Sequence, residues 1–139
     1  MAPRELLISS DLMRDVRAHL QACLPEEGCG LMGGVDFRVE RVIPISNAAH
    51  RTDRFRMDPR EQIEALASLE ADGLELVAIY HSHPQGPAEL SSTDLNEAAY
   101  PDSAYLIFSS PEAGWVARAF RIARGNAHEV VIRMEPEGG

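Results

Sequence analysis

The chain has 139 residues, of which 45% are hydrophobic and 25% are charged, a composition typical of a globular protein. Its 13 basic and 22 acidic side chains give a formal net charge of −9, which disfavours a nucleic-acid partner because a phosphate backbone requires a basic face. No apolar run is long enough to cross a membrane and the first residues lack a signal-peptide pattern, so we expect a cytoplasmic protein without a membrane partner.

The first part of the chain predicts a strand, a helix and a pair of strands. Residues 6–9 have the composition of a short strand, and Ser10 is expected to cap the helix that follows. Residues 29–35 predict a glycine-interrupted strand paired with residues 38–45, because glycine permits a bulge or a close backbone approach. Apolar side chains at four-residue spacing mark one face of the helix, which Pro25 would end: Leu12, Val16, Leu20 and Leu24.

The two cysteines, Cys23 and Cys29, flank these apolar elements. They are too few for a disulfide framework, so we expect both thiols to be reduced.

A second helix is predicted by the signals at its start. Asp58 supplies an N-cap, Pro59 suits the first helical position and Glu61 completes a capping box. The helix is expected to run to about Asp72, with Gly73 just past its end.

The remaining chain predicts mostly strands. Residues 74–82 (LELVAIYHS) are apolar enough for a central strand that is buried on both faces, and a third helix is expected to begin near Ser91 or Ser92. Further strands are predicted at residues 103–109, 115–123 and 128–134. With no repeat or linker, this order indicates one mixed α/β domain over residues 1–139, with a core at about 5–134 and a flexible tail at 135–139.

Two histidines at the end of the central strand form a candidate metal site. Alternate strand residues point the same way, so His81 and His83 present both imidazoles to one side while Ser82 faces the other. After a Pro/Gly loop, Asp94 returns a carboxylate from the first turn of the third helix. Two imidazoles and one carboxylate leave one position of a tetrahedral zinc for water, as in catalytic sites.

A hydrolytic site also requires a general base and a donor for the oxyanion. Glu26 and Glu27, just before the glycine-rich strand, are both candidates for the base, and the Ser91 hydroxyl could serve the oxyanion. Each part has a simpler interpretation, since Ser91-x-x-Asp94 matches a helix capping box and a His-x-His pair is often a surface pair. His19 shows no partner pattern and is expected on the solvated face of the first helix.

These parts together resemble the signature of the JAMM (MPN+) metallopeptidases. The signature has a glutamate ahead of a Cys-Gly pair, then His-x-His-Pro, a short spacer and Ser-x-x-Asp, which match residues 25–34 (PEEGCGLMGG) and 81–94 (HSHPQGPAELSSTD). The resemblance covers about residues 5–134, including Asn47 and residues 55–59, and implies a curved mixed β-sheet flanked by helices.

The resemblance also implies roles for the residues. Glu27, two positions before the cysteine, would be the general acid/base rather than Glu26, and Ser91 would stabilise the oxyanion. The ligands of a single Zn²⁺ would be His81, His83 and Asp94.

Compact members of the family resemble enzymes that act at the C-terminal Gly-Gly of small ubiquitin-like sulfur-carrier proteins and release cysteine or a conjugated protein. We therefore expect a deubiquitinase-like zinc isopeptidase with such a carrier as its partner. A chain of 139 residues has little room for the insertions that larger relatives use to hold ubiquitin chains. Pairing of MPN domains is common, which leaves a homodimer open.

Two alternatives stay open: a non-catalytic MPN scaffold, and a small-molecule amidase that uses the same zinc site. A zinc deaminase is disfavoured because the chain has no Pro-Cys-x-x-Cys segment.

Overall fold

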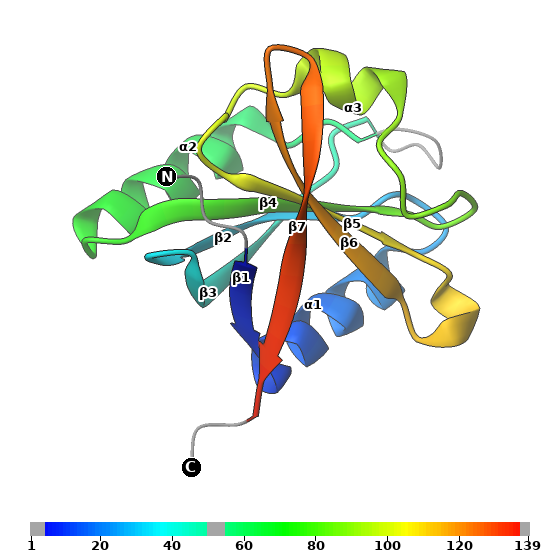
Figure 1. The fold of residues 1–139 in the computed structure, drawn as a ribbon, viewed down its shortest axis with the longest axis horizontal. Helices are drawn as coiled ribbons and strands as arrows, with labels where there is room; N and C mark the ends of the chain where they lie inside the picture. Colours follow the sequence, from blue (N-terminus) through cyan, green and yellow to red (C-terminus); the bar gives the residue numbers. More distant parts are fainter. Residues whose placement is uncertain (1–4, 50–54, 137–139) are drawn as a thin grey trace.

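Within residues 5–49 and 55–136, which a computed structural model describes, seven strands close into one mixed β-barrel (Figure 1). Their order around the barrel is β1-β3-β2-β4-β5-β6-β7. β4 runs parallel to β5, and β1 runs parallel to both of its neighbours, while the other pairs are antiparallel. The strands are β1 (Glu5–Ser9), β2 (Cys29–Val35), β3 (Arg38–Ile45), β4 (Glu75–His83), β5 (Ala104–Ser109), β6 (Val116–Ala123) and β7 (Asn126–Glu135).

The helices cover the two faces of the central strands. In Figure 1, α1 (Ser10–Cys23) lies on one side of β2 and β4, and α2 (Pro59–Ala71) and α3 (Ser92–Glu97) lie on the other. A 3₁₀ turn, η1 (Pro111–Ala113), joins β5 to β6. This arrangement confirms the predicted mixed sheet flanked by helices. None of the described helices is both long and apolar enough to span a membrane.

The start of the first helix and the end of the last strand differ from the predicted ones. The N-cap of α1 is Ser9, whose hydroxyl accepts from Leu12 N at 3.1 Å, so the prediction of Ser10 was one residue late. Ser9 has extended backbone angles, as an N-cap requires, whereas Ser10 already lies inside the helix. At the other end of the chain, β7 continues to Glu135, and residues 137–139 of the expected tail lie outside the described residues.

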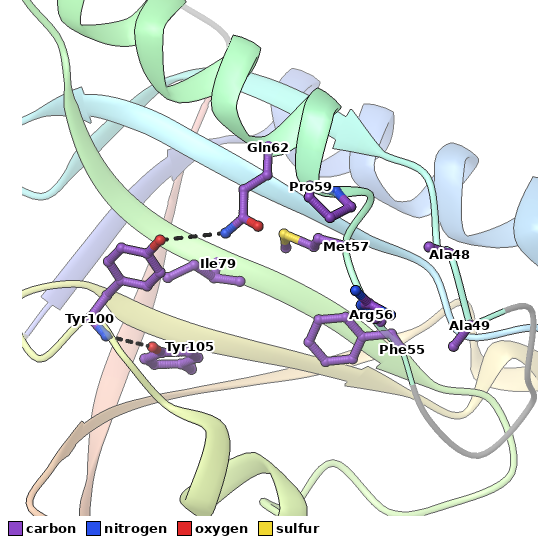
Figure 2. Close-up of a pocket in the computed structure, with 10 residues that line it drawn as sticks. All are labelled: Ala48, Ala49, Phe55, Arg56, Met57, Pro59, Gln62, Ile79, Tyr100 and Tyr105. Atoms are coloured by element: carbon purple, nitrogen blue, oxygen red, sulfur yellow. Dashed lines mark hydrogen bonds between the residues drawn. The ribbon is translucent and has the colours of Figure 1, made fainter.

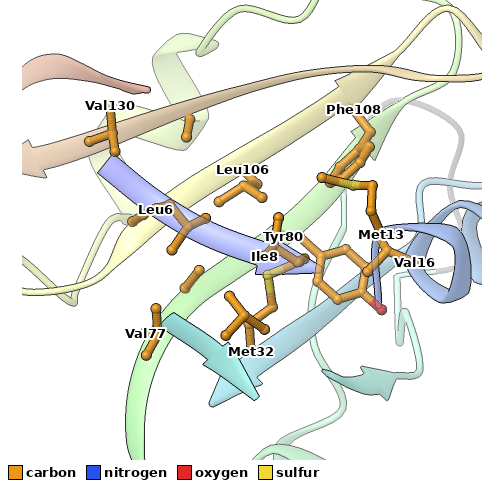
Figure 3. Close-up of a cluster of buried hydrophobic side chains, with 14 of the residues drawn as sticks. Leu6, Ile8, Met13, Val16, Met32, Val77, Tyr80, Leu106, Phe108 and Val130 are labelled. Atoms are coloured by element: carbon orange, nitrogen blue, oxygen red, sulfur yellow. The ribbon is translucent and has the colours of Figure 1, made fainter. Parts of the chain in front are cut away.

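Residues of β4 alternate between two apolar clusters, and this alternation sets the face on which the histidines lie. Ala78 and Tyr80 join the cluster beneath α1, shown in Figure 3, whereas Ile79 joins the cluster beneath α2 and α3. His81 and His83 share the face of Ile79, because strand residues alternate with a period of two. The candidate ligands therefore open on the α2 and α3 side of the sheet.

A glycine lets β2 lie against Tyr80 of β4. Gly30 pairs with Tyr80, and a Cβ atom at Gly30 would lie 2.3 Å from the Tyr80 ring. Only glycine fits this contact without displacing a fully buried tyrosine. The ladders of β2 also shift register near Gly33, as the glycine-interrupted pattern predicted.

His19 is half-buried, so the prediction that it lies on a solvated face was wrong. Its Nδ1 is 2.7 Å from the Tyr80 hydroxyl, and its Nε2 is 3.4 Å from the Cys23 sulfur. Burial lowers the pKa of His19 and raises the pKa of Tyr80. Both side chains are therefore neutral at pH 7, and the hydrogen bond between them ties α1 to β4. Cys23 and Cys29 are free thiols, as expected.

We predict that His19→Gln reduces the loss of stability on acidification. Because burial lowers the pKa of His19 in the fold, the unfolded chain binds the proton first as the pH falls through about 6.5. Stability that is present above this pH is then lost as the pH falls towards the folded-state pKa. Urea unfolding of the metal-free protein at pH 7.5 and 5.5 should give a smaller difference for His19→Gln than for wild type.

The matched control is His128→Gln, the same change at an exposed position of β7. This variant should keep the wild-type difference between the two pH values. An unchanged difference in His19→Gln would contradict the role assigned to the buried imidazole.

Candidate metal centre

The structure brings together the two histidines of β4 and the aspartate of α3. His81 Nε2 lies 3.1 Å from His83 Nε2 and 3.1 Å from Asp94 Oδ1, and His83 Nε2 lies 3.4 Å from Asp94 Oδ2. Ligand atoms held 2.0–2.1 Å from a tetrahedral zinc are about 3.3–3.4 Å apart, so these separations suit one ion. Imidazole nitrogen with carboxylate oxygen is also a donor set that zinc accepts.

Glu27 lies against the same donors. Its carboxylate and the ring nitrogens of His81 and His83 all lie within 4.8 Å of one another, and its side chain is only 4% exposed. Glu26 is more exposed than Glu27 and is not part of the described group of donor atoms around the two histidines. The structure thus has Glu27, which the family resemblance favours over Glu26, beside the two histidines.

The two imidazoles are held in different ways. His83 Nδ1 is 3.1 Å from the Pro87 carbonyl oxygen, which favours the tautomer whose Nε2 lone pair faces the site. The ring of His81 stacks on Phe55, with ring centroids 4.4 Å apart and an interplanar angle of 26°. Among the described residues, His81 Nδ1 has no hydrogen-bond partner, so the orientation of this ring depends on packing.

Burial and hydrogen bonds shift the pKa values of the three candidate ligands in different directions. Burial lowers the pKa of His81, which keeps its imidazole neutral. Burial alone would raise the pKa of Asp94, but hydrogen bonds with His81 and His83 outweigh it and hold that pKa well below its usual range. In His83 the burial effect, which lowers the pKa, is outweighed by hydrogen bonds to Asp94 and Pro87, which raise it.

Ser91 and Asp94 form a complete capping box at the start of α3. Ser91 Oγ accepts from Asp94 N at 3.0 Å, and Asp94 Oδ2 accepts from Ser91 N at 2.8 Å. The same Oδ2 atom faces His83, so the aspartate caps the helix while its carboxylate faces the histidines. The predicted capping box is confirmed, and it leaves the Ser91 hydroxyl proton available for donation.

Several contacts around the site could not be predicted from the sequence, although the family resemblance includes Asn47 and residues 55–59. Ser82 lies between the histidines but faces the other way, where its hydroxyl accepts from Gly28 N at 2.8 Å. Asn47 donates from Nδ2 to the Glu27 carbonyl oxygen at 2.9 Å, and Phe55 covers His81. These partners lie far from their targets in the chain, so no local spacing could have identified them.

A pocket of about 580 Å³, with aromatic and polar side chains in its wall, adjoins the stacked pair of Phe55 and His81. Figure 2 shows Phe55 and Met57 on one side of it and Tyr100 and Tyr105 on the other. The Tyr105 hydroxyl accepts from the Tyr100 and Ala99 amides, which fixes this aromatic wall. The pocket therefore lies beside the candidate metal centre, and most of its lining residues are aromatic or aliphatic.

Comparisons with known proteins agree with this geometry. Residues 9–123 match the family described as prokaryotic homologs of the JAB domain. A probable TtuB-protein conjugate cleaving protease from Thermus thermophilus is 39% identical over 128 residues, covering 91% of this chain and 82% of the relative. The CysO-cysteine peptidase of Mycobacterium tuberculosis is 34% identical over 132 residues, covering 93% and 90%.

A solved structure supports the same assignment. Protein DSY2949 from Desulfitobacterium hafniense superimposes with a TM-score of 0.84 at 34% identity, covering 95% of this chain and 94% of that protein. The family match, the two peptidase relatives and the convergence of His81, His83 and Asp94 agree on one assignment. The chain belongs to the prokaryotic JAB-domain family and is a compact enzyme of the JAMM peptidase type.

Proposed function

We propose that the chain hydrolyses the amide or isopeptide bond after the C-terminal Gly-Gly of a small ubiquitin-like or sulfur-carrier protein. The observation that carries this proposal is the convergence of His81, His83 and Asp94 beside the buried Glu27. The relatives support it, since one is named for cleaving TtuB-protein conjugates and the other for cleaving CysO-cysteine.

The donor set would hold zinc through His81, His83 and Asp94. When bound, zinc supplies a Lewis acid that acidifies water and polarises the scissile carbonyl. Glu27 accepts the proton of the attacking water and delivers it to the amide nitrogen as the C–N bond breaks. The Ser91 hydroxyl donates to the oxyanion: its oxygen accepts from Asp94 N, and this bond does not use the O–H proton.

The environment of Glu27 suits a proton shuttle. With 4% exposure, its carboxylate lies in a region of low effective dielectric constant, where interactions with nearby charge are stronger than in water. If zinc were held by the three candidate ligands, Glu27 would lie close to its bound water, because the carboxylate lies beside both histidines. These features favour hydrolysis over a purely structural metal site.

A diglycine tail suits this site because it has no side chains that could clash with the residues around the candidate ligands. Residues upstream of the diglycine would lie over the pocket formed by Phe55, Met57 and the two tyrosines. An apolar side chain there would bury surface against this wall and hold the tail in register.

We predict that Glu27→Gln retains zinc but lowers kcat by roughly 10²–10⁴-fold, because it removes only the proton shuttle. Zinc content by mass spectrometry and turnover of a cleavable carrier fusion would be measured on the same sample. Glu26→Gln is the matched control, one residue away, and should keep wild-type turnover. Equal losses in the two variants, or full activity in Glu27→Gln, would exclude Glu27 as the base.

We predict that His81→Ala and Asp94→Asn each lose stoichiometric zinc. The asparagine keeps an oxygen that can cap α3 but lacks the negative charge, so Asp94→Asn separates the two roles of this residue. Zinc quantification after gel filtration should fall well below the wild-type stoichiometry, and thermal stability should no longer rise on zinc addition. His128→Ala should behave as wild type; one bound zinc in His81→Ala would contradict the ligand assignment.

The substrate is tested with a panel of diglycine-ending carrier proteins extended at the C-terminus by cysteine, by a short peptide or through a lysine side chain. We predict cleavage after the second glycine in at least one arm, with products identified by intact mass. The arm that reacts fastest distinguishes a cysteine-releasing peptidase from an isopeptidase. Zinc-loaded protein that cleaves none of the panel would favour the scaffold or the small-molecule amidase.

A further inference from the structure

The peptide that joins Glu27 to Gly28 is held by side chains on both of its polar groups. Its carbonyl oxygen accepts from Asn47 Nδ2 at 2.9 Å, and its N–H donates to Ser82 Oγ at 2.8 Å. The next carbonyl, that of Gly28, accepts from Ser82 N at 3.0 Å. Ser82 lies between His81 and His83 in the chain, so these hydrogen bonds connect the Glu27–Gly28 peptide to the strand segment that carries both histidines.

Asn47 connects this peptide to a second part of the structure. Its Oδ1 accepts from Ala49 N and from Arg56 N, both at 3.0 Å. Asn47 also forms an isolated β-bridge with Met57, and only 8% of the residue is exposed. One side chain therefore joins Glu27 to both described ends of the segment that carries Phe55 against His81.

The chemistry of asparagine suits this position better than that of its near relatives. The site requires one N–H donor towards the Glu27 carbonyl and one oxygen that accepts from two amides. Aspartate supplies the oxygen but no donor, and serine is too short to serve both directions. A neutral amide also brings no buried charge next to the Glu27 carboxylate.

We propose that Asn47 is a positioning residue that holds the Glu27 carboxylate at the angle needed for proton transfer. The inference rests on the proposed function of Glu27 as general base. Asn47 acts through the Glu27–Gly28 peptide and does not touch the metal ligands in any described contact. A displacement of about 1 Å in a catalytic group can cost on the order of 10²-fold in rate, so releasing this peptide should affect turnover.

The test is Asn47→Asp, which keeps the acceptor for Ala49 N and Arg56 N but places an oxygen against the Glu27 carbonyl. We expect kcat to fall by roughly 10–100-fold, with KM within about twofold and zinc content unchanged. Asn126→Asp, the same change at the exposed first residue of β7, is the matched control and should keep wild-type kinetics. An unchanged kcat, or a loss explained fully by lower zinc content, would overturn the proposal.

A second measurement needs no substrate. Amide hydrogen exchange at Gly28 reports directly on the held peptide, and we expect it to accelerate by about tenfold or more in Asn47→Asp but not in Asn126→Asp. If Asn47→Asp does not fold, Asn47→Ser, which loses the reach to the Glu27 carbonyl, replaces it in both measurements. Unchanged exchange at Gly28 in the folded variant would overturn the proposal.

The two measurements separate this inference from the proposed function. A wild-type enzyme that cleaves no carrier fusion contradicts the proposed function, while the exchange of Gly28 still decides whether Asn47 holds the peptide. In the second case the wild-type enzyme cleaves a carrier fusion, but Asn47→Asp matches it in turnover and in amide exchange at Gly28. That result contradicts only the role of Asn47.

Discussion

The antiparallel pairing of β2 with β4, in which Cys29 lies opposite His81, sets the distance between the two halves of the site. Glu27 comes just before β2, and the histidines lie at the end of β4, so a ladder shift of one residue would move the glutamate away from both. Gly30 permits this pairing because no side chain separates β2 from the Tyr80 ring. The proposed acid/base and the candidate ligands thus depend on one register, which a glycine and a buried tyrosine maintain.

The parts of the site that could be predicted from the sequence are those in which residues close together in the chain have a regular spacing. His81 and His83 share a face because strand residues alternate, and Ser91 and Asp94 meet because a capping box spans three residues. The strand that carries the histidines and the helix that begins after Ser91 were predicted for the same reason. Choosing Glu27 over Glu26 required the family resemblance, because adjacent residues in a loop carry no period.

The remaining features depend on contacts between distant parts of the chain. Barrel closure requires β1 to pair with β7, which lies at the other end of the chain, and nothing in either segment specifies that partner. His19 has the spacing of a solvated helix position, yet the Tyr80 hydroxyl meets it from β4. The hydrogen bond with Tyr80 makes His19 a structural residue, and this bond depends on the folded arrangement of α1 and β4.

The short helix α3 links the metal centre to the fold around it. A helix of six residues is far below the length at which a helix is stable in water, so α3 depends on its cap and its packing. Asp94 supplies half of that cap, and the same carboxylate lies 3.1 Å from His81. Leu95 in the helix and Leu90 just before it pack on the cluster that contains Ile79 and Tyr105. The contacts of Asp94 with the histidines therefore also stabilise α3 and its packing against Tyr105, which lines the adjoining pocket.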